Sequence, residues 1–155
     1  MKKARAIEYL ARAVCVQDGC LMVCRRRGAS YCYLPGGHIE PGEAARSALR
    51  RELFEELGRR AVIGNFLGAM ENRYEKPDGS PVHELNLLFE ARFSNLRTTE
   101  PPLAAEPQLV FEWIPLPALK RSDLEPRLFR RVLAHPPPPG GWGWLSAIES
   151  GRKFG

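Results

Sequence analysis

Alternating and continuous apolar segments along the chain predict strands on both sides of one long helix. Residues 11–16 and 20–25 form a predicted hairpin that turns at Asp18-Gly19, a strong two-residue turn signal. The aromatic segment 31–34 predicts a short strand that stops at Pro35-Gly36-Gly37. Longer strands are predicted at residues 61–71, 82–93 and 109–114.

The helical period is clearest between Ala44 and Leu57, where leucines recur along one side. Gly58 follows directly, the residue expected just past a helix C-terminus. A last helix is predicted from Asp123 to Ala134, with Ser122 or Asp123 as its N-cap and a proline in its first turn. Mixed strands with a central and a terminal helix indicate a sheet covered by helices, an α/β or α+β sandwich.

The chain changes character after His135, where four prolines and two glycines precede Trp142-Gly143-Trp144. This composition is typical of a polyproline spacer followed by a short aromatic tail. A length of 155 residues suits one domain. We therefore expect a domain over residues 1–134 and a Pro/Gly-rich tail over 135–155, whose tryptophans pack on the body or on another subunit.

Composition narrows the class of protein. Hydrophobic residues make up 44% and charged residues 26%, which is ordinary for a globular domain. No segment approaches the ~18 apolar residues of a membrane span. The start, Met1-Lys2-Lys3, resembles a secretory signal, but Glu8 and Arg12 interrupt the apolar stretch that such a signal requires. We expect a cytoplasmic protein without a membrane partner.

Four cysteines fall within the first 32 residues and form no C-x-x-C pair: Cys15, Cys20, Cys24 and Cys32. In the predicted hairpin Cys15 faces Met22 and Cys24 faces Ala13, so these two cysteines are not paired with each other. We expect reduced, mostly buried thiols.

The charge balance, 23 basic against 18 acidic residues, gives a net charge of +5. Such a charge suits a nucleic acid or a polyanionic small molecule, and an arginine-rich solvated surface is the alternative. Nucleic acid is the less favoured partner, because the basic residues are scattered apart from Arg25–Arg27 and Arg59-Arg60.

Three carboxylates, those of Glu52, Glu55 and Glu56, project from one narrow arc of the helix beside its apolar stripe. Like charges at this spacing cost about 0.2–0.5 kcal/mol per pair, and acidic groups near a helix C-terminus oppose its dipole. Arg51 relieves this repulsion only in part. A solvated acidic face is one interpretation; a divalent cation such as Mg²⁺, held by carboxylate oxygens, is the other.

The loop before the helix completes a longer motif. From Gly37 the chain reads Gly, five residues, Glu43, seven residues, Arg51-Glu52-Leu53, one residue, Glu55-Glu56, one residue and Gly58. This 23-residue segment, Gly37–Arg59, resembles the signature box of the Nudix hydrolases. Arg59 departs from the usual aliphatic residue. The resemblance implies an α/β/α sandwich with a mixed central sheet, and hydrolysis of a nucleoside diphosphate linked to another moiety.

The resemblance also implies roles for residues of the box. Glu52 and Glu56 are expected to bind Mg²⁺ or Mn²⁺, with Glu55 as a further ligand or as the base that acts on water. The carbonyl of Gly36 is a further expected ligand. Arg51 is expected to hold the carboxylates in place. Gly37, at the tight bend, and Glu43, at the helix start, are counted as substrate-binding candidates.

Outside the box, a downstream glutamate is expected to assist, with Glu106 ranked ahead of Glu100 and Glu84. Arg25 and Arg26 are candidates for contact with phosphate, and exposed strand-end charges are the alternative. Tyr74 stacks on a base or packs across the sheet.

The sequence leaves the substrate open. Nucleoside triphosphates, ADP-ribose-like sugars, dinucleoside polyphosphates and a capped RNA end all fit. A non-catalytic Nudix-fold module that binds nucleotide or RNA is the alternative function, against which the three intact glutamates count. A homodimer is compatible with the resemblance.

Overall fold

The computed structural model describes residues 6–148. The first residues of the chain, where we expect no secretory signal, and the last seven residues of the tail lie outside this range. Within it, no helix combines the length and the apolar character needed to cross a bilayer.

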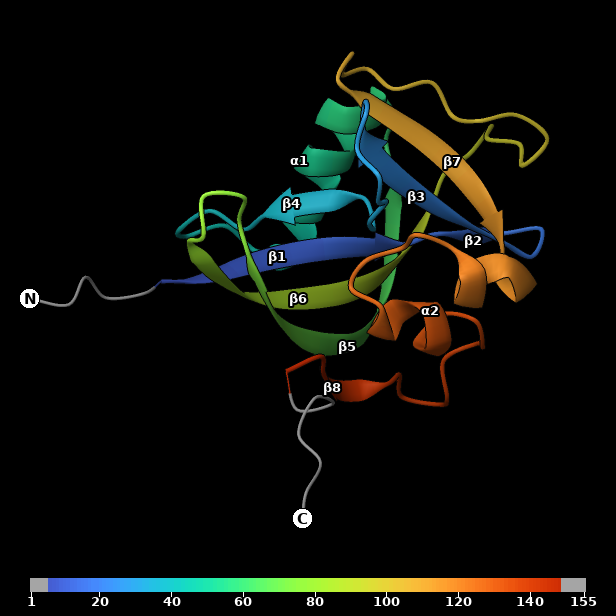
Figure 1. The fold of residues 1–155 in the computed structure, drawn as a ribbon. Coiled ribbons are helices and arrows are strands. Elements are labelled where there is room, and N and C mark those ends of the chain that lie inside the picture. Colours follow the sequence, from blue (N-terminus) through green and yellow to red (C-terminus); the bar gives the residue numbers. More distant parts are fainter. Residues whose placement is uncertain (1–5, 149–155) are drawn as a thin grey trace, which may run out of the picture.

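Two sheets form the centre of the molecule (Figure 1). The larger sheet has the strand order β4-β1-β6-β5-β8 and is mixed, since β1 runs parallel to β6 and β5 parallel to β8. The smaller sheet, β2-β3-β7, is antiparallel. The strands are β1 (Ile7–Val14), β2 (Val16–Gln17), β3 (Cys20–Arg26), β4 (Gly36–His38), β5 (Val62–Glu75), β6 (Pro81–Arg92), β7 (Leu109–Pro115) and β8 (Gly143–Ser146).

Helices cover both faces of these sheets. The long helix α1 (Ala45–Leu57) packs on one face, while the 3-10 helix η1 (Leu116–Arg121) and the short α2 (Leu128–Val132) pack on the other (Figure 1). A strand that is covered on both faces must be apolar on both faces, and successive side chains of a strand point to opposite faces. In β3, Met22 faces the α1 side and Leu21 the α2 side, and both are fully buried. The predicted α/β/α sandwich with a mixed sheet is confirmed.

The hairpin forms as predicted at Asp18-Gly19, but one cross-strand pairing was wrong. Cys24 lies opposite Tyr33 and Phe111 rather than Ala13, because β1, up to Val14, belongs to the larger sheet and the chain enters the small sheet only at Val16. All four cysteines are free, and three of them are buried. Burial raises the pKa of Cys15 to about 12, as expected for an unreactive thiol.

The strand predicted at residues 31–34 forms only two isolated bridges, through Cys32 and Tyr33, and the glycines that were predicted to stop it begin β4. Gly36 pairs with Arg12 of β1 at a φ of +124°, a conformation that favours glycine. A Cβ on Gly36 would lie 2.1 Å from the carbonyl oxygen of Ala11. The glycines therefore allow β4 to approach β1 closely.

The last helix is shorter than predicted, and neither Ser122 nor Asp123 is its N-cap, because the residues before it are bonded elsewhere. The amide of Cys32 donates to the carbonyl of Asp123 (3.2 Å), and the amide of Glu125 donates to the carbonyl of Cys32 (2.8 Å). These bonds hold the chain extended, so that α2 begins only at Leu128.

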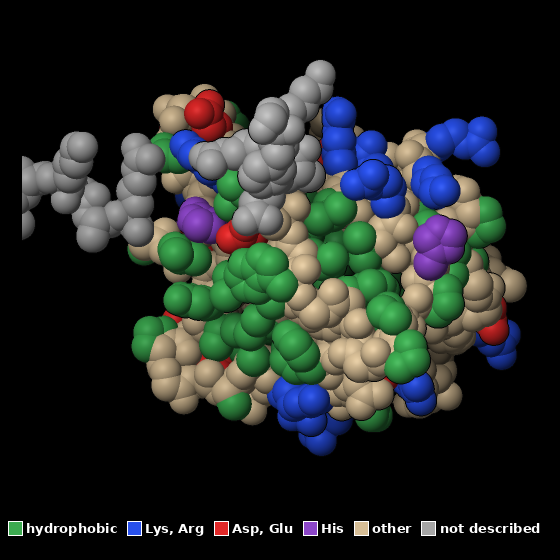
Figure 2. Space-filling model, turned by 90° about the horizontal axis from the view of Figure 1, so that it is seen from below, with side chains coloured by type: hydrophobic (Ala, Val, Ile, Leu, Met, Phe, Trp, Pro, Cys, Tyr) green, Lys and Arg blue, Asp and Glu red, His purple; other side chains and the backbone are tan. Residues whose placement is uncertain are grey.

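Part of the tail adds a strand to the sheet. In β8, Gly143–Ser146 pairs with Gly68–Glu71, and the amide of Trp142 donates to the carbonyl of Leu67 (2.6 Å). Trp142 packs against the core on the α2 side, whereas Trp144 is 59% exposed. Seen from the β8 side, hydrophobic side chains gather across this face and Lys and Arg lie toward its edges (Figure 2). The domain boundary after residue 134 stays a prediction.

Candidate active site

Two glycines bring strand β4 against the carboxylates of α1. Gly36 lies directly against β1, as described above. A Cβ on Gly37 would lie 2.4 Å from the carboxyl carbon of Glu52. Any larger residue at position 37 would therefore displace this carboxylate, and the turn and the helix form one unit.

Glu56 is the buried carboxyl group of this unit, with 6% of the residue exposed. Its Oε2 accepts a hydrogen bond from the amide of Gly36 (3.2 Å). The pKa of Glu56 is raised to about 8, chiefly by burial; the charges of Glu52 and Glu106 also raise it, whereas the Gly36 amide and Arg12 lower it. Ionised Glu56 therefore lacks sufficient positive charge around it, which a bound cation would supply.

Arg51 connects the remaining carboxylates of the box. Its guanidinium forms a bidentate pair with Glu43 (2.9 and 3.0 Å) and donates to Glu52 (2.8 Å) and to the carbonyl of His38 (3.1 Å). Glu55 lies 3.5 Å away and is half exposed. The bond from Arg51 lowers the pKa of Glu43. These are the contacts expected of Arg51 as the residue that holds the carboxylates.

The donor set suits a hard dication. Glu52, Glu55, Glu56 and the Gly36 carbonyl offer only oxygen atoms, which Mg²⁺ and Mn²⁺ prefer. Among residues 6–148, no three Asp, Glu, His or Cys side chains are already arranged as a complete metal site. The reason is visible in the contacts: Arg51 holds Glu52, while Glu56 turns to the Gly36 amide. The residues fit the cation chemically, and binding requires Glu56 to exchange its partner.

The loop before β7 brings Glu106 to the C-terminal end of α1. The carbonyl of Glu56 accepts bonds from the amides of Ala105 (2.8 Å) and Glu106 (3.5 Å), and the charge of Glu106 contributes to the raised pKa of Glu56. Its carboxylate also accepts from the side chain of Gln108. Of the two other candidates, Glu100 is exposed on the same loop, and Glu84 is buried on β6.

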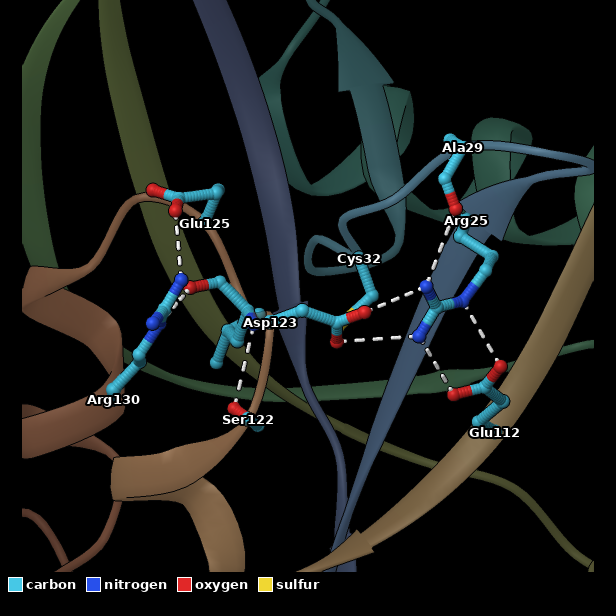
Figure 3. Close-up of polar contacts among 9 residues, drawn as sticks. Arg25, Ala29, Cys32, Glu112, Ser122, Asp123, Glu125 and Arg130 are labelled. Carbon is cyan, nitrogen blue, oxygen red and sulfur yellow. Dashed lines mark hydrogen bonds and ion pairs between the residues drawn. The ribbon is translucent and has the colours of Figure 1, made fainter.

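Arg25 lies in an ion-pair cluster with carboxylates of β7 and of the segment before α2 (Figure 3). Its guanidinium contacts Glu112 (2.9 and 3.1 Å) and Asp123 (2.7 and 3.2 Å), and donates to the carbonyl of Ala29 (3.4 Å). The Asp123 carboxylate also accepts from the thiol of Cys32 (3.2 Å). This cluster ties β3 and β7 to the segment before α2, so Arg25 has a full set of partners within the chain.

The two other predicted substrate-binding residues lie at the surface. Arg26 is exposed at the end of β3. Tyr74 is 42% exposed on β5, and burial, together with Glu84, raises the pKa of its hydroxyl to about 12. Both side chains are accessible to a ligand, and their roles stay predictions.

Sequence reasoning did not single out Arg12, which contacts the Gly36 turn. Its Nη1 donates to the carbonyls of Leu34 and Gly36, both at 3.1 Å, and its Nε donates to Asn86 (3.2 Å). The signal in the sequence was a single cation inside an apolar strand, Ala11-Arg12-Ala13-Val14. A charged residue in such a position needs partners within the fold.

Comparisons with known proteins agree with this geometry. The family model described as NUDIX domain matches residues 9–135. An RNA pyrophosphohydrolase of Erwinia tasmaniensis is 31% identical over 136 residues, covering 77% of each chain. An RNA pyrophosphohydrolase of Pectobacterium carotovorum is 41% identical over 66 residues, which are 41% of this chain but only 37% of that protein.

Solved structures show the same fold. The crystal structure of a MutT NUDIX hydrolase from Burkholderia pseudomallei matches with a TM-score of 0.60 at 24% identity, covering 73% of this chain and 86% of that one. The family, the fold and the enzyme class that the box predicted are therefore confirmed. The chain belongs to the Nudix family, hydrolases that act on phosphoanhydride bonds.

Proposed function

We propose that this chain is a pyrophosphohydrolase that uses Mg²⁺ or Mn²⁺ to cleave the phosphoanhydride bond of a nucleoside diphosphate linked to another group. The observation that carries the proposal is Glu56: a buried carboxyl beside the Gly36 turn, with a pKa raised to about 8. Burying a carboxyl group costs free energy of folding. This cost is accounted for if the ionised form of Glu56 binds a cation in the active site.

In this proposal Glu52 and Glu56 hold the cation, with Glu55 and the Gly36 carbonyl as further ligands. When bound, the cation neutralises phosphate charge and lowers the pKa of bound water. Arg51 keeps the carboxylates in place through its contacts with Glu43 and Glu52. Water adds to phosphorus, and the bond between phosphorus and the bridging oxygen breaks. Glu55, which is half exposed, or Glu106 accepts the proton.

The names of the relatives suggest which substrate to examine first. Both relatives described above are named RNA pyrophosphohydrolases. An RNA with a 5′-triphosphate contains the same anhydride bonds as a free nucleoside triphosphate, and a net charge of +5 favours a polyanion. RNA 5′ ends therefore join nucleoside triphosphates, ADP-ribose-like sugars and dinucleoside polyphosphates as candidates. The cytoplasmic location and the homodimer stay predictions.

A substrate panel tests the proposal. Purified protein is incubated with a 5′-triphosphorylated RNA, nucleoside triphosphates, ADP-ribose and a dinucleoside polyphosphate, with Mg²⁺ or Mn²⁺, and released phosphate and pyrophosphate are measured. We expect turnover of at least one compound, its loss in EDTA and its return with added cation. Glu56→Gln is the inactive control. Tight, salt-sensitive RNA binding without turnover of any compound would instead support a non-catalytic binding module.

A further inference from the structure

Arg12, Arg25 and Arg51 are partly buried next to the box or within the sheets, and their charges are balanced differently. Arg25 contacts the carboxylates of Glu112 and Asp123, and Arg51 contacts three glutamates. Arg12 has no carboxylate within 4 Å among residues 6–148. Arg25 and Arg51 are therefore paired directly with carboxylates, whereas Arg12 forms no ion pair in the described part of the chain and interacts with Glu56 only at longer range.

The partners of Arg12 are neutral groups. Its Nε donates to the amide oxygen of Asn86 (3.2 Å), and its Nη1 donates to the carbonyls of Leu34 and Gly36 (3.1 Å each). The ring of Tyr33 lies under the guanidinium, with its centroid 5.6 Å from the central carbon. These contacts fix the orientation of the side chain without cancelling its charge.

Nη2 of Arg12 is left without a partner in the described part of the chain. All bonds of this guanidinium go through Nε and Nη1. The only buried side-chain nitrogen or oxygen found there without a partner is Nε1 of Trp113. Nη2 is therefore not fully buried, and its two N–H groups are left to bind a ligand.

The guanidinium of Arg12 lies beside the Gly36 turn, which also contacts the box carboxylate Glu56. Arg12 lies opposite Gly36 across the β1–β4 pair and donates to the Gly36 carbonyl, while the Gly36 amide donates to Glu56. Gly36 therefore connects Arg12, through hydrogen bonds, to Glu56, the carboxylate that carries the proposed function. A phosphate oxygen bound at Nη2 would lie on the same turn as the proposed cation.

We propose that Arg12 is a substrate-binding residue, whose Nη2 binds an anionic oxygen of the substrate's phosphate chain beside the Gly36 turn. Arginine suits this contact because its planar donors match phosphate oxygens. The inference rests on the proposed function for the identity of the ligand. It assigns to Arg12 the phosphate contact that the sequence suggested for Arg25, whose donors are occupied.

Arg12→Lys tests the assignment, because it keeps the charge but cannot hold three oxygens and present a further donor. We expect KM for the hydrolysed substrate, and the Kd of the non-hydrolysable β,γ-imido analogue of ATP in EDTA, to rise about 10- to 100-fold, the effect of losing a charge-assisted bond. We expect kcat to change much less. The matched control Arg92→Lys alters an exposed arginine at the end of β6 and should leave both constants unchanged.

A measurement on the unaltered protein covers the case in which the variant is unstable. The side-chain ¹⁵N resonances of Arg12 should shift when the imido analogue is added in EDTA. A folded Arg12→Lys with wild-type Kd and KM, or Arg12 resonances that the analogue leaves unmoved at saturation, would overturn the assignment. Failure of the proposed function looks different, because the wild-type protein would then hydrolyse none of the compounds in the panel.

Discussion

Replacing Glu56 with glutamine distinguishes a metal-binding role of this carboxylate from a structural one. Glutamine has nearly the same shape, and its Oε1 can still accept the hydrogen bond from the Gly36 amide, which measures 3.2 Å in the native chain. It cannot ionise or supply a charge to a metal. We therefore expect opposite effects on activity and on the stability of the metal-free protein.

The magnitude follows from the raised pKa. Between an unfolded value of 4.5 and a folded value of about 8, the folded protein keeps a proton that the unfolded chain releases. The free energy of unfolding therefore falls as pH rises through this window, by about 5 kcal/mol as an upper bound at 1.36 kcal/mol per pKa unit. Glu56→Gln removes this loss, although its amide N–H groups forgo about 1–2 kcal/mol of hydrogen bonding.

Thermal unfolding in EDTA at pH 5 and at pH 9 measures the effect. The variant should melt about 2–8 °C below the wild type at pH 5 and roughly 5–15 °C above it at pH 9, at ~2–4 °C per kcal/mol for a chain of this size. Added Mg²⁺ should stabilise only the wild type. Turnover of the variant should fall by about a thousandfold. A melting difference that does not depend on pH, or near-wild-type turnover, would refute the reasoning.

Three further substitutions test how the site and the tail are built. Gly37→Ala should keep the melting temperature, because the three atoms nearest to its Cβ all belong to the flexible end of Glu52, but should lower kcat about a hundredfold in a steady-state assay by displacing that carboxylate. Gly36→Ala should instead cost about 3 kcal/mol or more in denaturant unfolding, since its Cβ meets the backbone of Ala11 at a left-handed φ. Trp142→Ala should lower stability by about 1–3 kcal/mol and leave kcat unchanged, because Trp142 packs on the core opposite α1; an equal loss of kcat would link the tail to the site.

Helix α1 could be predicted closely, because its determinants are local. The leucine spacing, the run of carboxylates and the final glycine all lie within one short segment. The structure ends the helix at Leu57, and Gly58 adopts a φ of +64°. The arc of carboxylates next to the Gly36 turn follows from the same pattern, which is why the family could be identified from the box.

Features set by distant partners could not be predicted. Arg25 reads as a free cation at a strand end, but its two carboxylates lie 87 and 98 residues further along the chain. The predicted start of the last helix was lost because Cys32 bonds the backbone of Asp123 and Glu125. No local pattern encodes either pairing, and the same holds for β8, whose partner strand begins at Val62.

The central claim is that the carboxylates of α1 hold a dication at the Gly36 turn. Diffraction from crystals soaked in Mn²⁺, with data collected at the manganese edge, tests it directly. We predict an anomalous peak bound by Glu52 and Glu56, and its absence in crystals of Glu56→Gln. Wild-type crystals with these glutamates directed into solvent and no peak between them would contradict the claim.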